Sequence, residues 1–273
     1  MIAALIDGVA SDRIAVDNRG LAYGDGIFRT LRMENREVVD FDLHYAKLSA
    51  DCAALKLACP SADSLRADAA ALGIDTCVLK WLIVRNAGGR GYSPLGAHGS
   101  RRISLAFALP AYPPQYYAKG VRVRSCDLRL AHQPALAGIK HLNRLENVLA
   151  RGEWDNPDIA EGLLFDHHDA LIGGTMSNVF VLYGHRLVTP PVDRAGVAGV
   201  TRARILAAAT ALDAEVSVAP VARESLASAN AIFVCNSVIG VWPVRALDQH
   251  VYAPHPLYAQ LRRVIMRDSF AST

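Results

Sequence analysis

The sequence predicts a mixed α/β protein with two domains. Runs of strand-like composition alternate with amphipathic helical runs over 273 residues, a length that suits two domains better than one. Hydrophobic residues make up 52% of the chain and charged residues 20%, as in a globular protein with a core. The proline-containing stretch 110–115 breaks regular structure. We therefore predict a smaller N-terminal α/β domain over 1–110, a linker over 111–120 and a larger C-terminal domain over 121–273.

Hydrophobic spacing defines the elements of the first domain. Apolar runs predict strands over 1–6, 37–41, 77–84 and 103–109. Helical periodicity predicts helices over 43–57 and 62–72, and Gly73 is placed to cap the second helix.

The second domain shows the same alternation. Apolar runs predict strands over 163–165, 178–183, 187–189, 215–219 and 231–235. Helices are predicted over 143–153, 201–212 and 256–267. For the first of these, Asn143 and Glu146 are spaced as an N-cap with its capping-box partner, and apolar residues recur at helical spacing.

Charge and cysteine usage exclude several function classes. The net charge is +3 without a dense basic run, so we expect neither nucleic acid nor a membrane surface as partner. The five cysteines are scattered and no two have metal-ligand spacing, so we predict no metal site and reduced thiols in a reducing cytoplasm. We find no signal peptide and no apolar run that could span a bilayer.

The most informative segment is 137–147, Ala-Gly-Ile-Lys-His-Leu-Asn-Arg-Leu-Glu-Asn. Lys140 stands on a glycine-containing turn just before a predicted helix, where its amine can reach a ligand. The segment resembles the cofactor-lysine motif of the 4-amino-4-deoxychorismate lyases, which are class IV aminotransferase-like enzymes. That resemblance implies the two-domain fold-type IV fold of D-amino acid aminotransferases and pyridoxal 5′-phosphate as cofactor. It also implies that Lys140, in the C-terminal domain, forms the internal aldimine.

Two segments are candidates for the cofactor phosphate. The run 195–202, Ala-Gly-Val-Ala-Gly-Val-Thr-Arg, leads through glycines into a helix, where free N–H groups and the helix dipole favour an anion. Ordinary N-capping explains the same pattern; the resemblance assigns the Val200 and Thr201 backbone and the Thr201 hydroxyl to the phosphate. In His-Tyr-Ala-Lys-Leu, Lys47 replaces the arginine usual in the family. Lys47 is assigned to the phosphate as a point charge, the alternative being a solvated lysine on a helix face.

The run Gly-Gly-Arg-Gly-Tyr within 86–94 is a tight loop that on its own predicts only a hairpin turn. It resembles the lyases more than the transaminases, which implies that Arg90 and Tyr92 lie near a substrate with two carboxylates. By the same resemblance, Thr30 in the segment 23–30 and Tyr112 in the linker lie near the substrate.

The late segment 235–244 also resembles the lyases, and its Asn236 and Ser237 are expected to approach cofactor or substrate. One position departs from the family. Counting back from Asn178, Gly173 occupies the place of the glutamate that holds the pyridine nitrogen protonated. Without that carboxylate the cofactor is expected to be a poorer electron sink.

The resemblance implies a lyase of folate biosynthesis that converts 4-amino-4-deoxychorismate to 4-aminobenzoate and pyruvate and acts as a homodimer. The freed Lys140 amine would remove the proton at the amine-bearing ring carbon, a desolvated cationic site keeping its pKa low enough for a base. Two alternatives stay open. One is a branched-chain or D-amino acid transaminase of the same fold, and the other is a degenerate non-catalytic member, because of Gly173 and Lys47.

Overall fold

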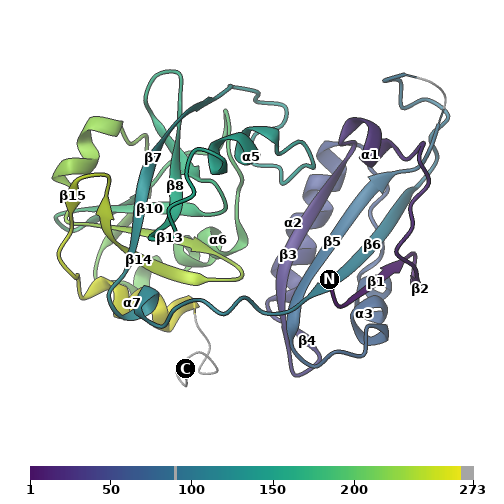
Figure 1. Cartoon of the computed structure of the whole chain (residues 1–273), viewed down its shortest axis with the longest axis horizontal. Coiled ribbons are helices and arrows are strands. Elements are labelled where there is room, and N and C mark those ends of the chain that lie inside the picture. Colours follow the sequence, from purple (N-terminus) through teal and green to yellow (C-terminus); the bar gives the residue numbers. More distant parts are fainter. Residues whose placement is uncertain (89–90, 266–273) are drawn as a thin grey trace. The chain divides into compact units, whose positions relative to one another are not determined.

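The chain divides into two compact units, each with its own sheet (Figure 1). The structure, a computed structural model, describes residues 1–88 and 91–265. Unit 1 comprises Met1–Ala111 and the short segment Ile139–Asn143, and unit 2 comprises Tyr112–Gly138 and the chain from Arg144 onward. The chain therefore passes from unit 2 into unit 1 and back again around Lys140, which the sequence had placed in the C-terminal domain.

Unit 1 contains a six-stranded antiparallel sheet in the order β2-β1-β6-β5-β3-β4. Its strands are β1 (Ala3–Ile6), β2 (Val9–Ala10), β3 (Gly26–Glu34), β4 (Glu37–Val38), β5 (Cys77–Arg85) and β6 (Ser100–Phe107). Its helices are α1 (Arg19–Tyr23), α2 (Phe41–Ala54) and α3 (Ala62–Ala71).

The long helices α2 and α3 cover one face of this sheet. Side chains alternate across a strand, so the odd-numbered residues of β3 and β5 point to that face. Leu31 and Trp81 are fully buried there against Leu48 of α2 and Leu65 of α3. On the opposite face, Phe28, Thr30, Lys80 and Leu82 are half-buried.

Unit 2 contains a nine-stranded mixed sheet in the order β12-β11-β10-β13-β14-β7-β8-β9, with β15 paired to β14. Its strands are β7 (Val121–Leu130), β8 (Ile159–Asp166), β9 (Leu171–Gly174), β10 (Asn178–Tyr183), β11 (Arg186–Thr189), β12 (Glu215–Val218), β13 (Ala231–Asn236), β14 (Gly240–Leu247) and β15 (His250–Val251). Its helices are α4 (Gln115–Ala118), α5 (Leu145–Arg151), α6 (Val200–Ala207) and α7 (Leu257–Ile265), with 3-10 turns η1 (Ala209–Ala211) and η2 (Arg223–Ser228).

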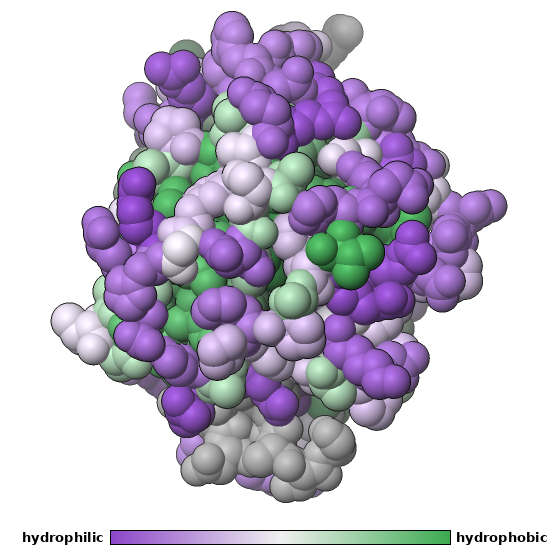
Figure 2. Space-filling model, turned by 90° about the vertical axis from the view of Figure 1, so that its left-hand side faces the viewer, coloured by the Kyte–Doolittle hydropathy of each residue, from purple (hydrophilic) through white to green (hydrophobic). Residues whose placement is uncertain are grey.

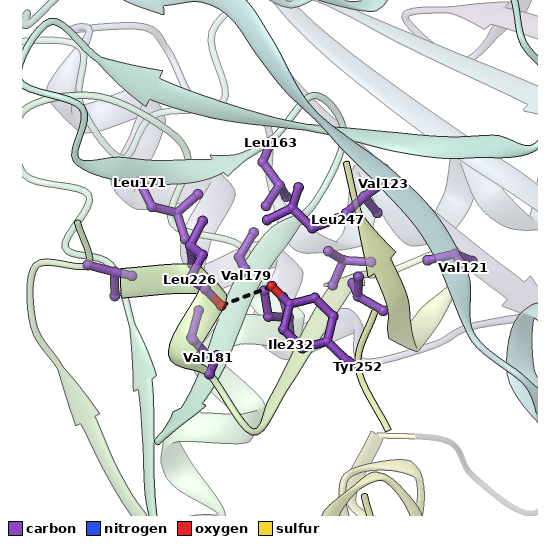
Figure 3. Packing of buried hydrophobic residues seen from close by; sticks show 14 of the residues in the cluster. Val121, Val123, Leu163, Leu171, Val179, Val181, Leu226, Ile232, Leu247 and Tyr252 are labelled. Carbon is purple, nitrogen blue, oxygen red and sulfur yellow. Dashed lines mark hydrogen bonds between the residues drawn. The ribbon is translucent and has the colours of Figure 1, made fainter. Parts of the chain in front are cut away.

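Both faces of this second sheet are buried. Val179 and Val181 of β10 belong to one core, in which the Tyr252 hydroxyl donates a hydrogen bond to the Leu226 carbonyl at 2.9 Å (Figure 3). The alternate residues Phe180 and Leu182 belong to a second core, which α6 and α7 cover. The central strands are therefore continuous apolar runs in the sequence, and this pattern predicted β10 and β13.

One face of the molecule is mainly polar. Figure 2 shows one face on which hydrophilic side chains dominate and hydrophobic ones form only small separate areas. Across the described part of the chain, no helix is both long and apolar enough to cross a membrane.

The predicted helix over 143–153 needs correction. The helix found is α5 (Leu145–Arg151), with Arg144 at its N-cap position and no side-chain cap. The Asn143 side chain instead donates to the Gly24 carbonyl at 3.2 Å, and Glu146 accepts from the Ala131 N–H at 3.1 Å. These tertiary contacts take the two side chains that the capping box would have used.

Candidate active site

Lys140 lies on an extended segment beside β3. The Phe28 N–H donates to the Lys140 carbonyl at 2.9 Å, and the Leu142 N–H donates to the Gly26 carbonyl at 2.9 Å. Gly26 permits this approach, since a β-carbon there would lie 2.5 Å from the Ile83 carbonyl oxygen and 2.9 Å from Leu142 Cδ1. These bonds explain why the segment groups with unit 1.

A second lysine shares the neighbourhood of Lys140. The Lys140 ammonium lies 4.5 Å from the centre of the Phe28 ring, and the Lys80 ammonium lies 4.8 Å from the same ring. Thr30 of β3 is directly opposite Lys80 of β5, on the sheet face away from the helices. Burial lowers the pKa of Lys80. Sequence analysis missed Lys80, although a lysine inside the apolar run 77–84 was a visible signal.

Lys47 belongs to a buried charge cluster. Its ammonium pairs with one oxygen of Asp51, one turn further along α2, and the other Asp51 oxygen pairs with Arg29 of β3. The exposed fractions of the Lys47, Asp51 and Arg29 side chains are 24%, 2% and 3%. Burial lowers the pKa of both Lys47 and Arg29, while Asp51 opposes this shift. Lys47 therefore does not lie on a solvated helix face, and sequence analysis missed its two partners.

The loop expected to meet the substrate is fixed through Arg19. This buried guanidinium pairs with Asp25 at 2.8 Å and donates to the Gly91, Tyr92 and Ser93 carbonyls at 3.0, 2.9 and 3.3 Å. The Tyr92 side chain is 85% exposed and makes an edge contact with the Tyr23 ring. Arg90 lies outside the described residues.

In unit 2, the predicted phosphate turn opens α6. Its N-cap, Gly199, is extended and contributes no side-chain cap, so the first helical N–H groups are left for another acceptor. The Thr201 hydroxyl lies 3.4 Å from the Ser237 hydroxyl, which brings two of the predicted cofactor residues together. A β-carbon on Gly199 would overlap the Asn178 side-chain oxygen.

The turn before α6 is bonded to the chain leading into Lys140. The Gly138 N–H donates to the Gly196 carbonyl at 3.1 Å, and the Ala198 N–H donates to the Gly138 carbonyl at 3.0 Å. Gly138 has a φ of +75°, which favours glycine at this position. Two residues before Lys140, the main chain is therefore held by the phosphate turn of unit 2.

Asn236 and Tyr112 have structural partners. The Asn236 side-chain oxygen accepts from the Val238 and Ile239 N–H groups at 2.8 and 2.9 Å, and its amide donates to the Met176 carbonyl at 3.0 Å. Asn236 therefore shapes its own turn. The Tyr112 ring packs edge-on against Trp242, with 4.8 Å between the ring centres. Burial raises the pKa of Tyr112.

Gly173 and Gly174 of β9 have different surroundings. A β-carbon on Gly173 would meet only the Ser177 carbonyl oxygen, at 3.1 Å, whereas one on Gly174 would overlap the Ser177 hydroxyl and lie 2.7 Å from the Glu161 carboxylate. Because successive strand residues point to opposite faces, Glu161 is not on the Gly173 side.

Glu161 is the fully buried carboxylate that sequence analysis missed. It accepts from the Thr175 and Ser177 hydroxyls and from the Gly162, Thr175 and Met176 N–H groups, so it holds the turn after β9. Burial raises the pKa of Glu161, and the hydroxyl hydrogen bonds oppose this effect.

The fold and the lysine-centred site define a class of protein, and comparison with known families agrees. The chain belongs to the class IV amino-transferase family, whose model matches residues 26–247. Members of this family use pyridoxal 5′-phosphate. The predicted fold-type IV architecture is confirmed.

Among individual proteins, the chain is similar to 4-amino-4-deoxychorismate lyase from Pseudomonas aeruginosa. The two are 39% identical with a TM-score of 0.91, over 95% of this chain and 97% of that structure. It is also 32% identical to the aminodeoxychorismate lyase of Vibrio harveyi, over 89% of this chain and 90% of that protein. The branched-chain amino acid aminotransferase of Escherichia coli shares the fold, with a TM-score of 0.83 at 21% identity over 96% of this chain and 92% of that structure.

Proposed function

We propose that this protein is a pyridoxal 5′-phosphate-dependent lyase that converts 4-amino-4-deoxychorismate to 4-aminobenzoate and pyruvate in cytoplasmic folate biosynthesis. The observation that carries the proposal is Lys140. Its main chain is fixed against β3 and its amine lies at Phe28 beside the desolvated Lys80. This arrangement stands in a chain that matches an aminodeoxychorismate lyase over most of its length.

The residues present fit a phosphorylated cofactor. Lys47 supplies a buried positive charge, and the start of α6 supplies the Val200 and Thr201 N–H groups and the Thr201 hydroxyl. Ser237 lies beside that hydroxyl, whereas Asn236 acts through the turn that it shapes. When bound, pyridoxal phosphate supplies an electron sink for the charge left by a departing proton.

Lys140 both holds the cofactor and moves the proton. Its amine removes the proton at the amine-bearing ring carbon of the substrate. That proton is returned to the methylene carbon of the enolpyruvyl group, whose bond from oxygen to the ring breaks, so the group leaves as pyruvate and the ring becomes aromatic. The Phe28 ring lies against the amine, and the Lys80 ammonium lies against the same ring.

The two substrate carboxylates require cationic and hydrogen-bonding partners. We assign Arg90 and Tyr92 to this role. Arg19 holds the main chain at Tyr92 and at its two neighbours through their carbonyl groups. Thr30 lies on the same sheet face as Phe28, and Tyr112 of unit 2 completes the proposed set.

Gly173 favours lyase chemistry over transamination. It offers no side chain to the ring nitrogen, and Glu161 faces the other way. Aromatisation of the product provides a driving force of its own, so a lyase tolerates a weaker electron sink better than a transaminase does.

A homodimer fits the exposed surface of α5. The side chains of Leu145, Val148 and Leu149 are 69%, 63% and 58% exposed on this one helix. Adjacent apolar side chains on a helix favour a protein partner. Analytical ultracentrifugation tests the dimer, and Val148→Glu should shift the protein toward the monomer.

The activity test mixes protein, pyridoxal phosphate and 4-amino-4-deoxychorismate. We expect 4-aminobenzoate, detected by fluorescence, and pyruvate, detected with a coupled dehydrogenase, in equal amounts. D-alanine and branched-chain amino acids should not convert the bound cofactor to its amine form at a comparable rate. Rapid conversion without 4-aminobenzoate would identify a transaminase, and neither reaction would identify a non-catalytic member.

A further inference from the structure

One buried carboxylate joins three parts of the candidate site. Asp51 pairs through one oxygen with Lys47 and through the other with Arg29. That second oxygen also accepts from the Lys140 N–H at 3.4 Å. The contacts connect a phosphate candidate on α2, a cation on β3 and the main chain of the predicted cofactor lysine, all within unit 1.

Lys47 and Arg29 share the Asp51 carboxylate. Desolvation lowers the pKa of both cations despite that carboxylate. The buried Arg29 Nε has no hydrogen-bond acceptor among residues 1–88 and 91–265. Two adjacent cations that are partly removed from water are stabilised by an anion, so the cluster is suited to a phosphate group.

We propose that Asp51 is a positioning residue, which holds Lys47 and Arg29 for the cofactor phosphate and at the same time fixes the main chain at Lys140. The inference rests on the proposed function. Arg29 thereby adds a buried positive charge beside Lys47, which compensates for the lysine that stands in place of arginine. Because the Asp51 carboxylate also contacts the Lys140 N–H, its loss should weaken binding even of a cofactor that lacks the phosphate.

Pyridoxal and pyridoxal 5′-phosphate separate these two roles. Lys47→Ala removes the proposed phosphate contact and one partner of Asp51, but it keeps the Asp51 oxygen that accepts from the Lys140 N–H. It should therefore weaken binding of pyridoxal phosphate and change binding of pyridoxal much less. Asp51→Asn removes the negative charge and replaces one of the two acceptor oxygens with a donor, so the side chain can no longer accept from Lys47, Arg29 and the Lys140 N–H together. It should weaken both ligands, by about tenfold for pyridoxal phosphate, the size expected for a lost charge-assisted hydrogen bond, and by less for pyridoxal. Dissociation constants come from visible-absorbance titrations, with borohydride trapping to confirm attachment to Lys140.

Asp68 provides the matched control. It is another buried carboxylate of unit 1, on α3, and it pairs with Arg102 at 2.6 Å and accepts from the Ser104 hydroxyl at 2.7 Å. Asp68→Asn should lower the melting temperature as Asp51→Asn does, without changing either dissociation constant. If Asp51→Asn fails to fold, Arg29→Met/Asp51→Asn removes the buried carboxylate together with its arginine partner. The double variant should show the same loss for pyridoxal and a larger loss for pyridoxal phosphate, because a proposed phosphate cation is also gone.

The outcomes are distinct. If Asp51→Asn, or the double variant, binds both ligands with unchanged affinity, the positioning role is wrong while the proposed function stands. If it weakens only pyridoxal phosphate, the link to Lys140 is wrong. If the unsubstituted protein forms no borohydride-stable adduct with pyridoxal phosphate, the proposed function fails, and this inference with it.

Discussion

Restoring a carboxylate at position 173 is the sharpest perturbation that the site offers. In Gly173→Glu, the new β-carbon would meet only the Ser177 carbonyl oxygen, at 3.1 Å, so a shift of a few tenths of an ångström accommodates it. The backbone of Gly173 is also outside the left-handed region that only glycine adopts readily. The β-carbon therefore requires no left-handed backbone, only a small shift of the Ser177 carbonyl.

The size of the effect follows from electrostatics. A carboxylate about 4 Å from a charged ring nitrogen contributes up to about 4 kcal/mol at an effective dielectric constant of about 20. This corresponds to an increase of up to about three units in the nitrogen pKa. Without cofactor, the same carboxylate is buried and unpaired, which costs about 1–3 kcal/mol of stability. Gly173→Glu should therefore be less stable alone and gain more stability from cofactor than the unsubstituted protein.

Three measurements check this prediction. The ¹⁵N chemical shift of labelled cofactor should move toward the protonated ring, thermal unfolding should show the larger stabilisation, and the single-turnover lyase rate should rise. As control, Gly174→Ala overlaps the Ser177 hydroxyl and should lose stability with or without cofactor, with no change in the ¹⁵N shift. A Gly173→Glu protein that binds cofactor normally, with unchanged shift and rate, would refute the reasoning.

Three further predictions concern other parts of the site. Lys47→Ala should cost about 1–3 kcal/mol of cofactor affinity and alter turnover little at saturating cofactor, because a phosphate contact stabilises ground state and transition state equally. Unchanged cofactor affinity in a titration would exclude Lys47 from the phosphate site. Arg19→Met removes the donor to the Gly91, Tyr92 and Ser93 carbonyls, so KM for substrate should rise several-fold while kcat stays nearly the same. If steady-state kinetics show an unchanged KM, this loop does not contact the substrate. Burial raises the pKa of Glu161, so the folded protein binds the Glu161 proton more tightly than the unfolded chain does. The free energy of unfolding should therefore fall as the pH rises from about 4.5 through the pKa of Glu161 in the folded state. In urea unfolding, the stability of Glu161→Gln relative to the unsubstituted protein should therefore increase over this pH range. A relative stability that decreases would mean that the hydrogen bonds to the carboxylate outweigh its burial.

Local sequence patterns predicted much of the fold. The helix predicted over 62–72 is found as α3 (Ala62–Ala71), and Gly73 follows it with a φ of +65°. The run 178–183 matches β10 (Asn178–Tyr183), because both faces of that strand are apolar and buried. In both cases the signal lies within the element itself.

The strand β3 was missed although its pattern was present. Ile27, Leu31 and Met33 alternate with half-buried residues, but Arg29 takes the next inward position and interrupts the apolar face. That arginine is tolerated because Asp51, 22 residues later, pairs with it from α2. Only the packing of α2 on the sheet makes the pair, so spacing along the chain could not predict it.

The same reasoning separates the predicted site residues from those that were missed. Lys140 and Thr201 stand in short motifs, which a sequence displays directly. Asp51, Lys80 and Glu161 are single residues in ordinary elements. Their importance appears only when the fold removes each from water beside a specific partner.

Borohydride trapping followed by peptide mapping tests the central claim most directly. The protein is incubated with pyridoxal phosphate, reduced and digested, and the labelled lysine is identified by mass spectrometry. We expect the label on Lys140 alone, and its loss in Lys140→Ala while circular dichroism shows the fold intact. Label on Lys80, which shares the Phe28 ring with Lys140, or on Lys47 or Lys119, would contradict the account.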